Sequence, residues 1–285
     1  MNQVRDGNKK SPLITRVVSG LVGTILFVAV LLFNKSFPFL INACVSLICI
    51  LAVHEVFNVI DIKKKLFVTV PTLIFASILP LFGFGIVWYT IWYLYTGIMF
   101  FNLIRSNGIF NLRDILSIYA MTMLITFSMR LIVEVRNFDP TIGSLYVCYA
   151  LSVAWLSDTG AYFFGSYFGK NKLCPQISPK KTIEGVIGGI GLCVIGSLLI
   201  FFIFSKFIFL DQIRANYFAV LAISIVGSSI SVFGDLVFSA IKRGYKVKDF
   251  GNIMPGHGGV LDRFDSVIFV VPFIYICMNI FDFVY

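Results

Sequence analysis

The chain has 285 residues, of which 58% are hydrophobic and only 13% are charged, and its formal net charge is +9. Soluble domains carry roughly 25% charged residues, so this composition excludes a soluble globular protein and indicates an integral membrane protein. The six cysteines show no metal-ligand spacing, which indicates small buried residues and not a zinc or disulfide framework.

Nine apolar segments predict transmembrane helices, because a hydrocarbon core of about 30 Å needs roughly 20 helical residues. They lie at 17–33, 37–59, 66–82, 84–104, 114–132, 144–167, 183–208, 216–241 and 265–284. The fold class that we predict is therefore all-α, a polytopic integral membrane protein with about nine transmembrane helices.

The cations predict how these helices are oriented. With the N-terminus in the cytoplasm, 18 of the 23 Lys and Arg residues fall on the inner side. Such a bias is the positive-inside rule, so topology explains the net charge and no nucleic-acid partner is expected. The two most polar loops, 168–182 and 242–264, then face the cytoplasm, which supplies nucleotides and free Mg²⁺.

The first half of the chain carries little chemistry. His54 and Glu55 lie near the inner end of the second predicted helix. The simplest interpretation is a polar pair that reaches the membrane surface or a neighbouring helix, and we favour it over a functional role.

The sixth predicted helix carries an acid well inside an apolar span. An ionised aspartate in hydrocarbon costs roughly 2.5–3.5 kcal/mol, so Asp158 is expected to face a cavity or a partner. Helical spacing places Asp158, Tyr162, Gly165 and Gly169 on one face, where small residues allow close packing. A structural, hydrogen-bonding aspartate is the alternative to a functional one.

The loop after this helix ends in Ser178, Pro179, Lys180, Lys181 and Thr182. Its two prolines stop any helix across it, and Ser178 or Thr182 can cap the next helix. Adjacent lysines beside hydroxyls at a helix start predict a phosphate pocket, with topology lysines plus a cap as the alternative. The next helix carries glycines that predict close helix packing, namely Gly185, Gly188, Gly189 and Gly191.

The eighth predicted helix carries a polar stripe. Its members, at spacings of four, four and three, are Ser231, Asp235, Ser239 and Lys242. Such a stripe must face protein or water, because lipid cannot satisfy polar groups.

Residues 239–266 form the most polar stretch of the chain, with five cations, three carboxylates and His257. Carboxylates interleaved with cations and a glycine-rich turn predict a site for a metal ion and a polyanion. Asp262 and Asp265 lie where the last helix begins. If that helix starts early, both share one face, and if it starts late, Asp265 or Ser266 is its cap.

Five acids therefore gather near the cytoplasmic face, namely Asp158, Asp235, Asp249, Asp262 and Asp265. The sequence has no Ser-His-Asp nucleophile pattern, CxxC pair or HExxH motif. Phosphate chemistry by positioning and charge neutralisation is favoured over covalent catalysis. Because the site would open to both water and lipid, one substrate is expected to be a soluble phosphate compound and the other a lipid.

The stretch 239–265, SAIKRGYKVKDFGNIMPGHGGVLDRFD, resembles the signature of the phosphatidate cytidylyltransferases, also called CDP-diglyceride synthases. Met254, where the family usually has Leu, Ile or Phe, is a conservative departure. The runs SDTGAY at 157–162, SPKKTIEG at 178–185 and FGDL at 233–236 also resemble that family. The matching motifs cover about 155–266, whereas the first 140 residues resemble it only in being apolar helices.

The resemblance implies transfer of CMP from CTP to phosphatidic acid, giving CDP-diacylglycerol and pyrophosphate in phospholipid biosynthesis. It implies Mg²⁺ as cofactor, and some members of the family use a monovalent cation beside it. The implied metal ligands are Asp235, Asp262, Asp265 and Asp158. The implied catalytic residues are Asp235, Asp262, Lys242, Arg243, His257 and Asp249. The residues implied to bind substrate are Ser178, Lys180, Lys181, Thr182, Ser239, Lys248, Gly258, Gly259 and Arg263.

The predicted organisation follows from these motifs. It comprises a cytoplasmic segment 1–16, N-terminal transmembrane helices over 17–140, and a catalytic transmembrane region over 141–285. The expected partners are CTP, phosphatidic acid and membrane lipid, and the sequence does not decide between a monomer and a homodimer. The expected location is a bacterial inner (plasma) membrane with the site facing the cytoplasm.

Two alternative functions are open. A CTP-dependent polyprenol or dolichol-type lipid kinase would transfer the γ-phosphoryl group and release CDP. A cation transporter could line its path with Asp158 and Asp235. The charge is concentrated on one face and no matching acids lie on the outer side, which argues against the transporter.

Overall fold

The computed structural model describes residues 20, 23, 25–31, 33, 37, 39–61, 65–105, 111–210, 212–254 and 258–285. This part of the chain is mostly helical. Its helices are α2 (Leu40–Ile60), α3 (Leu66–Ile78), α4 (Ile86–Arg105), α5 (Leu112–Asn137), α6 (Gly143–Phe168), α7 (Ile183–Ile203), α8 (Tyr217–Gly244), α9 (Leu261–Phe264) and α10 (Val267–Ile280). Short turns of tighter or wider helix extend α3 over Leu79–Leu81 and α7 over Phe204–Ile208.

Six helical segments within the described residues are long and apolar enough to cross a membrane. They are α2, α4, α5, α7 with its extension to Ile208, α8, and the joined α9 and α10. Leu66–Leu81 is apolar but shorter, and α6 is long but less apolar because it carries Asp158 among other polar residues. A mostly helical fold with six candidate membrane spans agrees with the prediction, whereas nine spans and a cytoplasmic N-terminus stay predictions.

The loop 168–182 folds as a β-hairpin, so the all-α prediction is wrong there. Strands β1 (Lys172–Cys174) and β2 (Ser178–Thr182) pair antiparallel, with Lys172 opposite Thr182. The two prolines exclude a helix, and pairing within the loop satisfies its backbone groups instead. The Thr182 hydroxyl accepts the Gly185 N–H at 3.2 Å and caps α7, as predicted.

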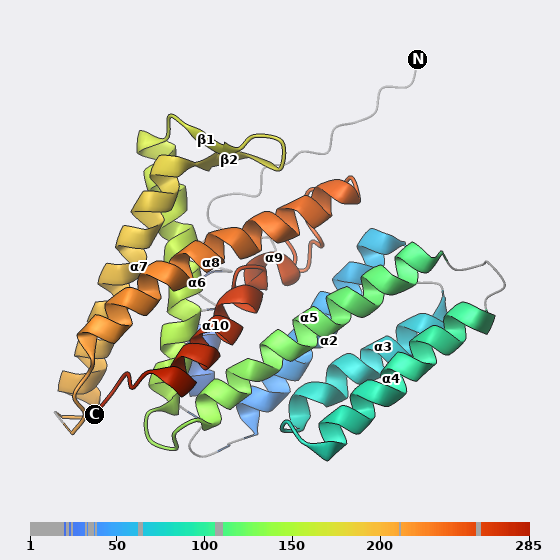
Figure 1. The fold of residues 1–285 in the computed structure, drawn as a ribbon, viewed down its shortest axis with the longest axis horizontal. Helices are drawn as coiled ribbons and strands as arrows, with labels where there is room; N and C mark the ends of the chain where they lie inside the picture. Colours follow the sequence, from blue (N-terminus) through green and yellow to red (C-terminus); the bar gives the residue numbers. More distant parts are fainter. Residues whose placement is uncertain are drawn as a thin grey trace.

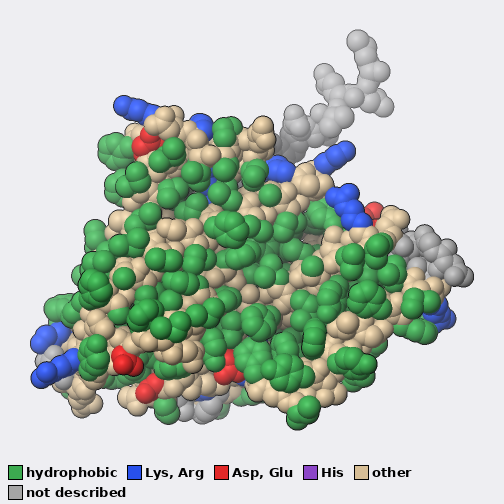
Figure 2. Space-filling view, in the orientation of Figure 1, with side chains coloured by type: hydrophobic (Ala, Val, Ile, Leu, Met, Phe, Trp, Pro, Cys, Tyr) green, Lys and Arg blue, Asp and Glu red, His purple; other side chains and the backbone are tan. Residues whose placement is uncertain are grey.

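The helices form two groups joined by α10. Helices α6 and α7 lie side by side and carry the hairpin at one end, while α3 and α4 flank α2 and α5 on the other side (Figure 1). Helix α10 contacts α5, α6 and α8. Hydrophobic side chains cover the broad middle of the face in Figure 2, and Lys and Arg lie toward its edges, as expected for a membrane protein.

Glycines set the close approach of α6 and α7. A Cβ at Gly160 would lie 2.9 Å from the Gly189 Cα, and one at Gly189 would lie 2.6 Å from the Ser157 carbonyl oxygen. These contacts confirm the packing role predicted for the α7 glycines, except at Gly191, where a Cβ would meet nothing within 4 Å. Tyr162 lies one turn after Asp158 on α6, as predicted, but it is 72% exposed, so close packing does not extend to it.

Gly189→Ala is therefore expected to lower the thermal stability of the protein in detergent. The new methyl group would press on the backbone of α6, and overpacking of this kind costs about 1–3 kcal/mol. Gly191→Ala, on the same helix, is the matched control and should leave the unfolding midpoint unchanged or raise it slightly. Equal midpoints for the two variants would contradict this packing.

Candidate active site

The polar stripe of α8 faces protein, as predicted. Its members are Ser231, Asp235, Ser239 and Lys242. The Ser231 hydroxyl donates to Asp158 Oδ1 at 3.4 Å, and the Ser239 hydroxyl donates to Asp235 Oδ1 at 3.2 Å. Lys242 Nζ donates to Asp262 Oδ1 at 2.8 Å. One helix face thus collects acids from α6, α8 and the segment before α10.

The β-hairpin delivers one lysine to this face. Lys181 Nζ lies 2.6 Å from Asp235 Oδ2 and 3.4 Å from the Val232 carbonyl oxygen. Successive side chains of a strand point to opposite faces, so Lys180 points away and is exposed. Of the two adjacent lysines predicted to bind substrate, Lys181 alone therefore contacts the acid cluster.

Lys242 joins two acids at the start of the last helices. Its Nζ lies 2.8 Å from Asp262 and 3.8 Å from Asp265 Oδ2, and both aspartate side chains are less than a tenth exposed. Helix α9 begins at Leu261, so both acids approach Lys242 as the early start predicts. The last helix, α10, begins at Val267 with Ser266 at the N-cap position, as the late start predicts, although the Ser266 side chain makes no capping hydrogen bond. Removal of one partner from a buried pair leaves the other charge uncompensated, so the lysine and the aspartates depend on one another for their positions.

Asp262 is also tied to the backbone of the loop before it. Its Oδ2 accepts the Phe250 N–H at 2.9 Å and the Gly259 N–H at 3.1 Å. Gly258 has a φ of +86°, the left-handed region that favours glycine, and its carbonyl oxygen accepts the Met254 N–H at 2.9 Å. Asp262 therefore shapes the turn in addition to pairing with Lys242.

Asp158 completes the cluster from α6. The Ser266 hydroxyl donates to its Oδ2 at 2.8 Å, and Asp158 and Asp265 both lie within electrostatic range of Asp235. The four predicted metal ligands thus lie in one connected network, although they are far apart in the sequence.

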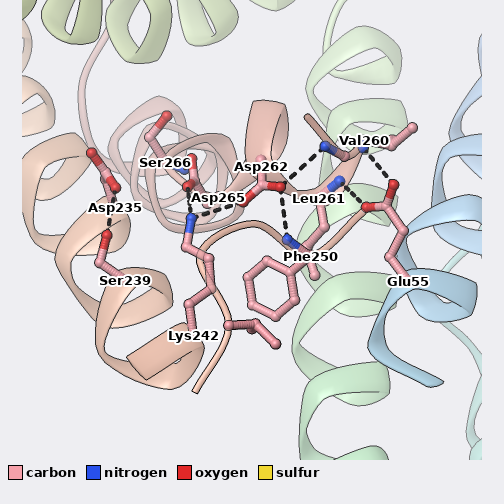
Figure 3. Close-up of polar contacts among 12 residues, drawn as sticks. Glu55, Asp235, Ser239, Lys242, Phe250, Val260, Leu261, Asp262, Asp265 and Ser266 are labelled. Atoms are coloured by element: carbon pink, nitrogen blue, oxygen red, sulfur yellow. Dashed lines mark hydrogen bonds and ion pairs between the residues drawn. The ribbon is translucent and has the colours of Figure 1, made fainter. Parts of the chain in front are cut away.

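Glu55 is the site residue that sequence reasoning missed. Its side chain is fully buried, and its two oxygens accept the N–H groups of Val260 and Leu261, each at 2.8 Å (Figure 3). Of the two alternatives predicted for this polar pair, Glu55 shows contact with a neighbouring helix, since it meets the start of α9, and not a position at the surface, whereas His54 beside it is exposed. The available signal was an acid inside an apolar run, the same signal that singled out Asp158.

The other predicted residues lie outside the acid cluster. Arg243 donates to the Ile177 carbonyl oxygen at 3.4 Å and to that of Val247 at 3.1 Å, so it ties the end of α8 to the hairpin. The exposed side chains among the predicted set are Lys180, Arg243, Lys248, Asp249 and Arg263. Ser178 is half-buried on β2. His257 lies outside the described residues.

The acids offer the oxygen ligands that Mg²⁺ prefers. Among the residues that the structure describes, no group of three or more His, Cys, Asp or Glu side chains is arranged to hold an ion. Lysines meet the acids instead, Lys181 at Asp235 and Lys242 at Asp262. The donor chemistry fits the cation, and the ligand roles of the four acids stay predictions.

Comparisons with known proteins relate most of the chain to one family. The model of the cytidylyltransferase family matches residues 14–281. A phosphatidate cytidylyltransferase of Bacillus subtilis is 34% identical over 278 residues, which cover 93% of this chain and 97% of that protein. Phosphatidate cytidylyltransferases of Staphylococcus epidermidis and Staphylococcus haemolyticus are 48% and 46% identical, over about half of this chain and half of each relative. The family match includes every residue of the acid cluster and Glu55.

Proposed function

The chain belongs to the cytidylyltransferase family, and from this premise we propose a function for its acid cluster. The protein is a nucleotidyltransferase, a phosphatidate cytidylyltransferase, which converts CTP and phosphatidic acid into CDP-diacylglycerol and pyrophosphate. The observation that carries the proposal is the network of Asp158, Asp235, Asp262 and Asp265 with Lys181 and Lys242. Its members are buried or half-buried within a bundle that has six candidate membrane spans.

The reaction needs two polyanions to meet. A phosphate oxygen of phosphatidic acid attacks the α-phosphorus of CTP, and the bond to the bridging oxygen of the leaving pyrophosphate breaks. The lipid phosphate is already an anionic nucleophile, so no strong general base is required. Lys181 and Lys242 stand where cationic side chains can neutralise the phosphates and the developing charge on pyrophosphate.

Asp235, Asp262, Asp265 and Asp158 are the residues that would hold Mg²⁺ in this proposal. The support for this role is chemical: the four side chains offer carboxylate oxygens, are largely buried, and are connected through α8. A bound divalent ion would neutralise phosphate charge and orient the α-phosphate. A second, monovalent cation is part of the proposal, on the ground of the same acid-rich environment.

Chelation of divalent ions is expected to remove activity. With EDTA, formation of CDP-diacylglycerol should fall to background, and excess Mg²⁺ should restore it, because lysines alone leave the acid cluster without its counter-ion. EDTA that is saturated with Mg²⁺ before addition is the control and should not inhibit. Full activity in excess EDTA would refute the Mg²⁺ proposal while leaving the reaction itself standing.

The proposed location is a bacterial inner membrane, with nine spans, a cytoplasmic N-terminus and the site open to the cytoplasm. Support comes from the bias of Lys and Arg toward one side in the sequence. The hairpin and the C-terminal end of α8, both rich in cations, lie toward the same side of the molecule (Figure 1). Membrane lipid and a second copy of the chain are the further partners proposed.

The direct test of the function uses purified protein in mixed micelles with CTP and phosphatidic acid. Pyrophosphate is expected to appear only when both substrates are present. Release of CDP with phosphorylated lipid would support the lipid kinase instead, and cation flux into liposomes without nucleotide would support the transporter.

A further inference from the structure

Glu55 reaches the acid cluster from the opposite half of the molecule. Helix α2 carries it to the first turn of α9, where its carboxylate meets the N–H groups of Val260 and Leu261 (Figure 3). Both carboxylate oxygens are used, and the side chain has no exposed surface. Substrate therefore has no free oxygen of Glu55 to contact.

Two glycines, Gly251 and Gly259, pack closely against this carboxylate. A Cβ at Gly251 would lie 2.6 Å from the Glu55 carboxyl carbon, and a Cβ at Gly259 would lie 2.7 Å from the same atom. Real Cβ atoms do not approach so closely, so both positions admit only glycine without a shift of the loop or of Glu55. The loop is therefore built to fit this side chain.

Glu55 and Asp262 divide the loop's buried N–H groups between them. Asp262 accepts those of Phe250 and Gly259, and Glu55 accepts those of Val260 and Leu261. The three consecutive N–H groups of residues 259–261 are thus all bound by carboxylates. Because Asp262 follows directly, the backbone that Glu55 holds sets where the Asp262 carboxylate points and hence where Lys242 is placed.

We propose that Glu55 is a positioning residue for nucleotidyl transfer: it locks residues 259–261 so that Asp262 and Lys242 are aimed at the reacting phosphates. The inference rests on the proposed function. Loss of the Glu55 carboxylate oxygens would leave the buried N–H groups of Val260 and Leu261 unsatisfied. Because such groups are costly, the loop would shift to a conformation in which they are hydrogen-bonded. A displacement of about 1 Å at an active site can cost roughly 10²-fold in rate.

The test is Glu55→Gln, which keeps the shape of the side chain but places an NH₂ group against an N–H. We expect kcat to fall roughly 10- to 100-fold, with KM for CTP and for phosphatidic acid within about twofold of wild type. A purely structural role would reduce the amount of folded protein and leave kcat per folded molecule unchanged. His54→Gln, the exposed neighbour on α2, is the matched control and should retain wild-type kcat.

Hydrogen exchange supplies a readout that does not depend on activity. In Glu55→Gln, the amides of residues 259–261 should exchange faster, while peptides from α7 remain as in wild type. If this variant does not fold, Gly251→Ala, which presses on Glu55 from the loop side, should lower kcat in the same way.

Two outcomes overturn the inference. One is wild-type kcat in Glu55→Gln, with or without a change in KM. The other, if that variant does not fold, is wild-type kcat in Gly251→Ala. Failure of the proposed function is distinguishable, because the wild-type protein would then make no CDP-diacylglycerol at all.

Discussion

Asp262→Asn is expected to abolish the formation of CDP-diacylglycerol, with a fall of at least about 10³-fold. Asp262 uses one oxygen for Lys242 and the other for the Phe250 and Gly259 N–H groups. Asparagine has only one oxygen, so its NH₂ group must face either the ammonium or the two amides. A buried cation loses its partner or the loop loses its anchor, and a predicted metal ligand loses its charge.

The measurement is product formed per mole of purified protein, alongside the amount of protein extracted from the membrane fraction. The amount of protein in the membrane fraction should match wild type, because insertion is set by the long apolar helices, which this substitution leaves unchanged. Asp114→Asn, in the first turn of α5, is the control and should retain activity. Near-normal turnover of Asp262→Asn would contradict the assignment of the site.

Lys181→Met is expected to lower kcat/KM by roughly 10²-fold, which is typical for loss of one preorganised charged group. The ammonium of Lys181 is the hairpin's only described ion-pair link to the acid cluster, 2.6 Å from Asp235. Methionine keeps much of the length and apolar stem of the side chain, so packing is retained while the charge is lost. The effect should therefore be on catalysis and not on folding.

Lys172→Met is the matched control for this variant, because Lys172 lies on the same hairpin and is exposed. Its kcat/KM should change by less than about twofold, as expected for an exposed charge. An additional Asp235→Asn should cost less in the Lys181→Met background than in wild type, since residues that act together are not additive. Equal losses in the two lysine variants would show a general effect of hairpin charge and refute the specific role of Lys181.

The helix positions were predictable because long apolar runs leave few choices. The segment expected at 216–241 forms α8 at Tyr217–Gly244, and the break expected near Gly83 separates Leu79–Leu81 from α4. The hairpin was not predicted, since its pairing of Lys172 with Thr182 depends on contacts within a polar loop that carries no alternating apolar pattern.

The acid cluster was predictable in membership but not in detail. Helical spacing on α8 correctly indicated that Asp235, Ser239 and Lys242 share a face. Sequence spacing could not tell which of the two adjacent lysines points toward the acids, because their side chains would point in different directions at the start of a helix and in a strand. It also could not connect Glu55 to residues more than 200 positions later, because that contact is made only by the packing of α2 against α9.

The central claim, that this site transfers a nucleotide and not a phosphoryl group, is tested most directly by the position of the label in CTP. Purified protein is given phosphatidic acid with CTP that carries radioactive phosphorus at either the α or the γ position. Label from the α position should enter the lipid phase, and label from the γ position should stay in the aqueous phase as pyrophosphate. Lipid that takes up the γ label, or that takes up neither, would contradict the account.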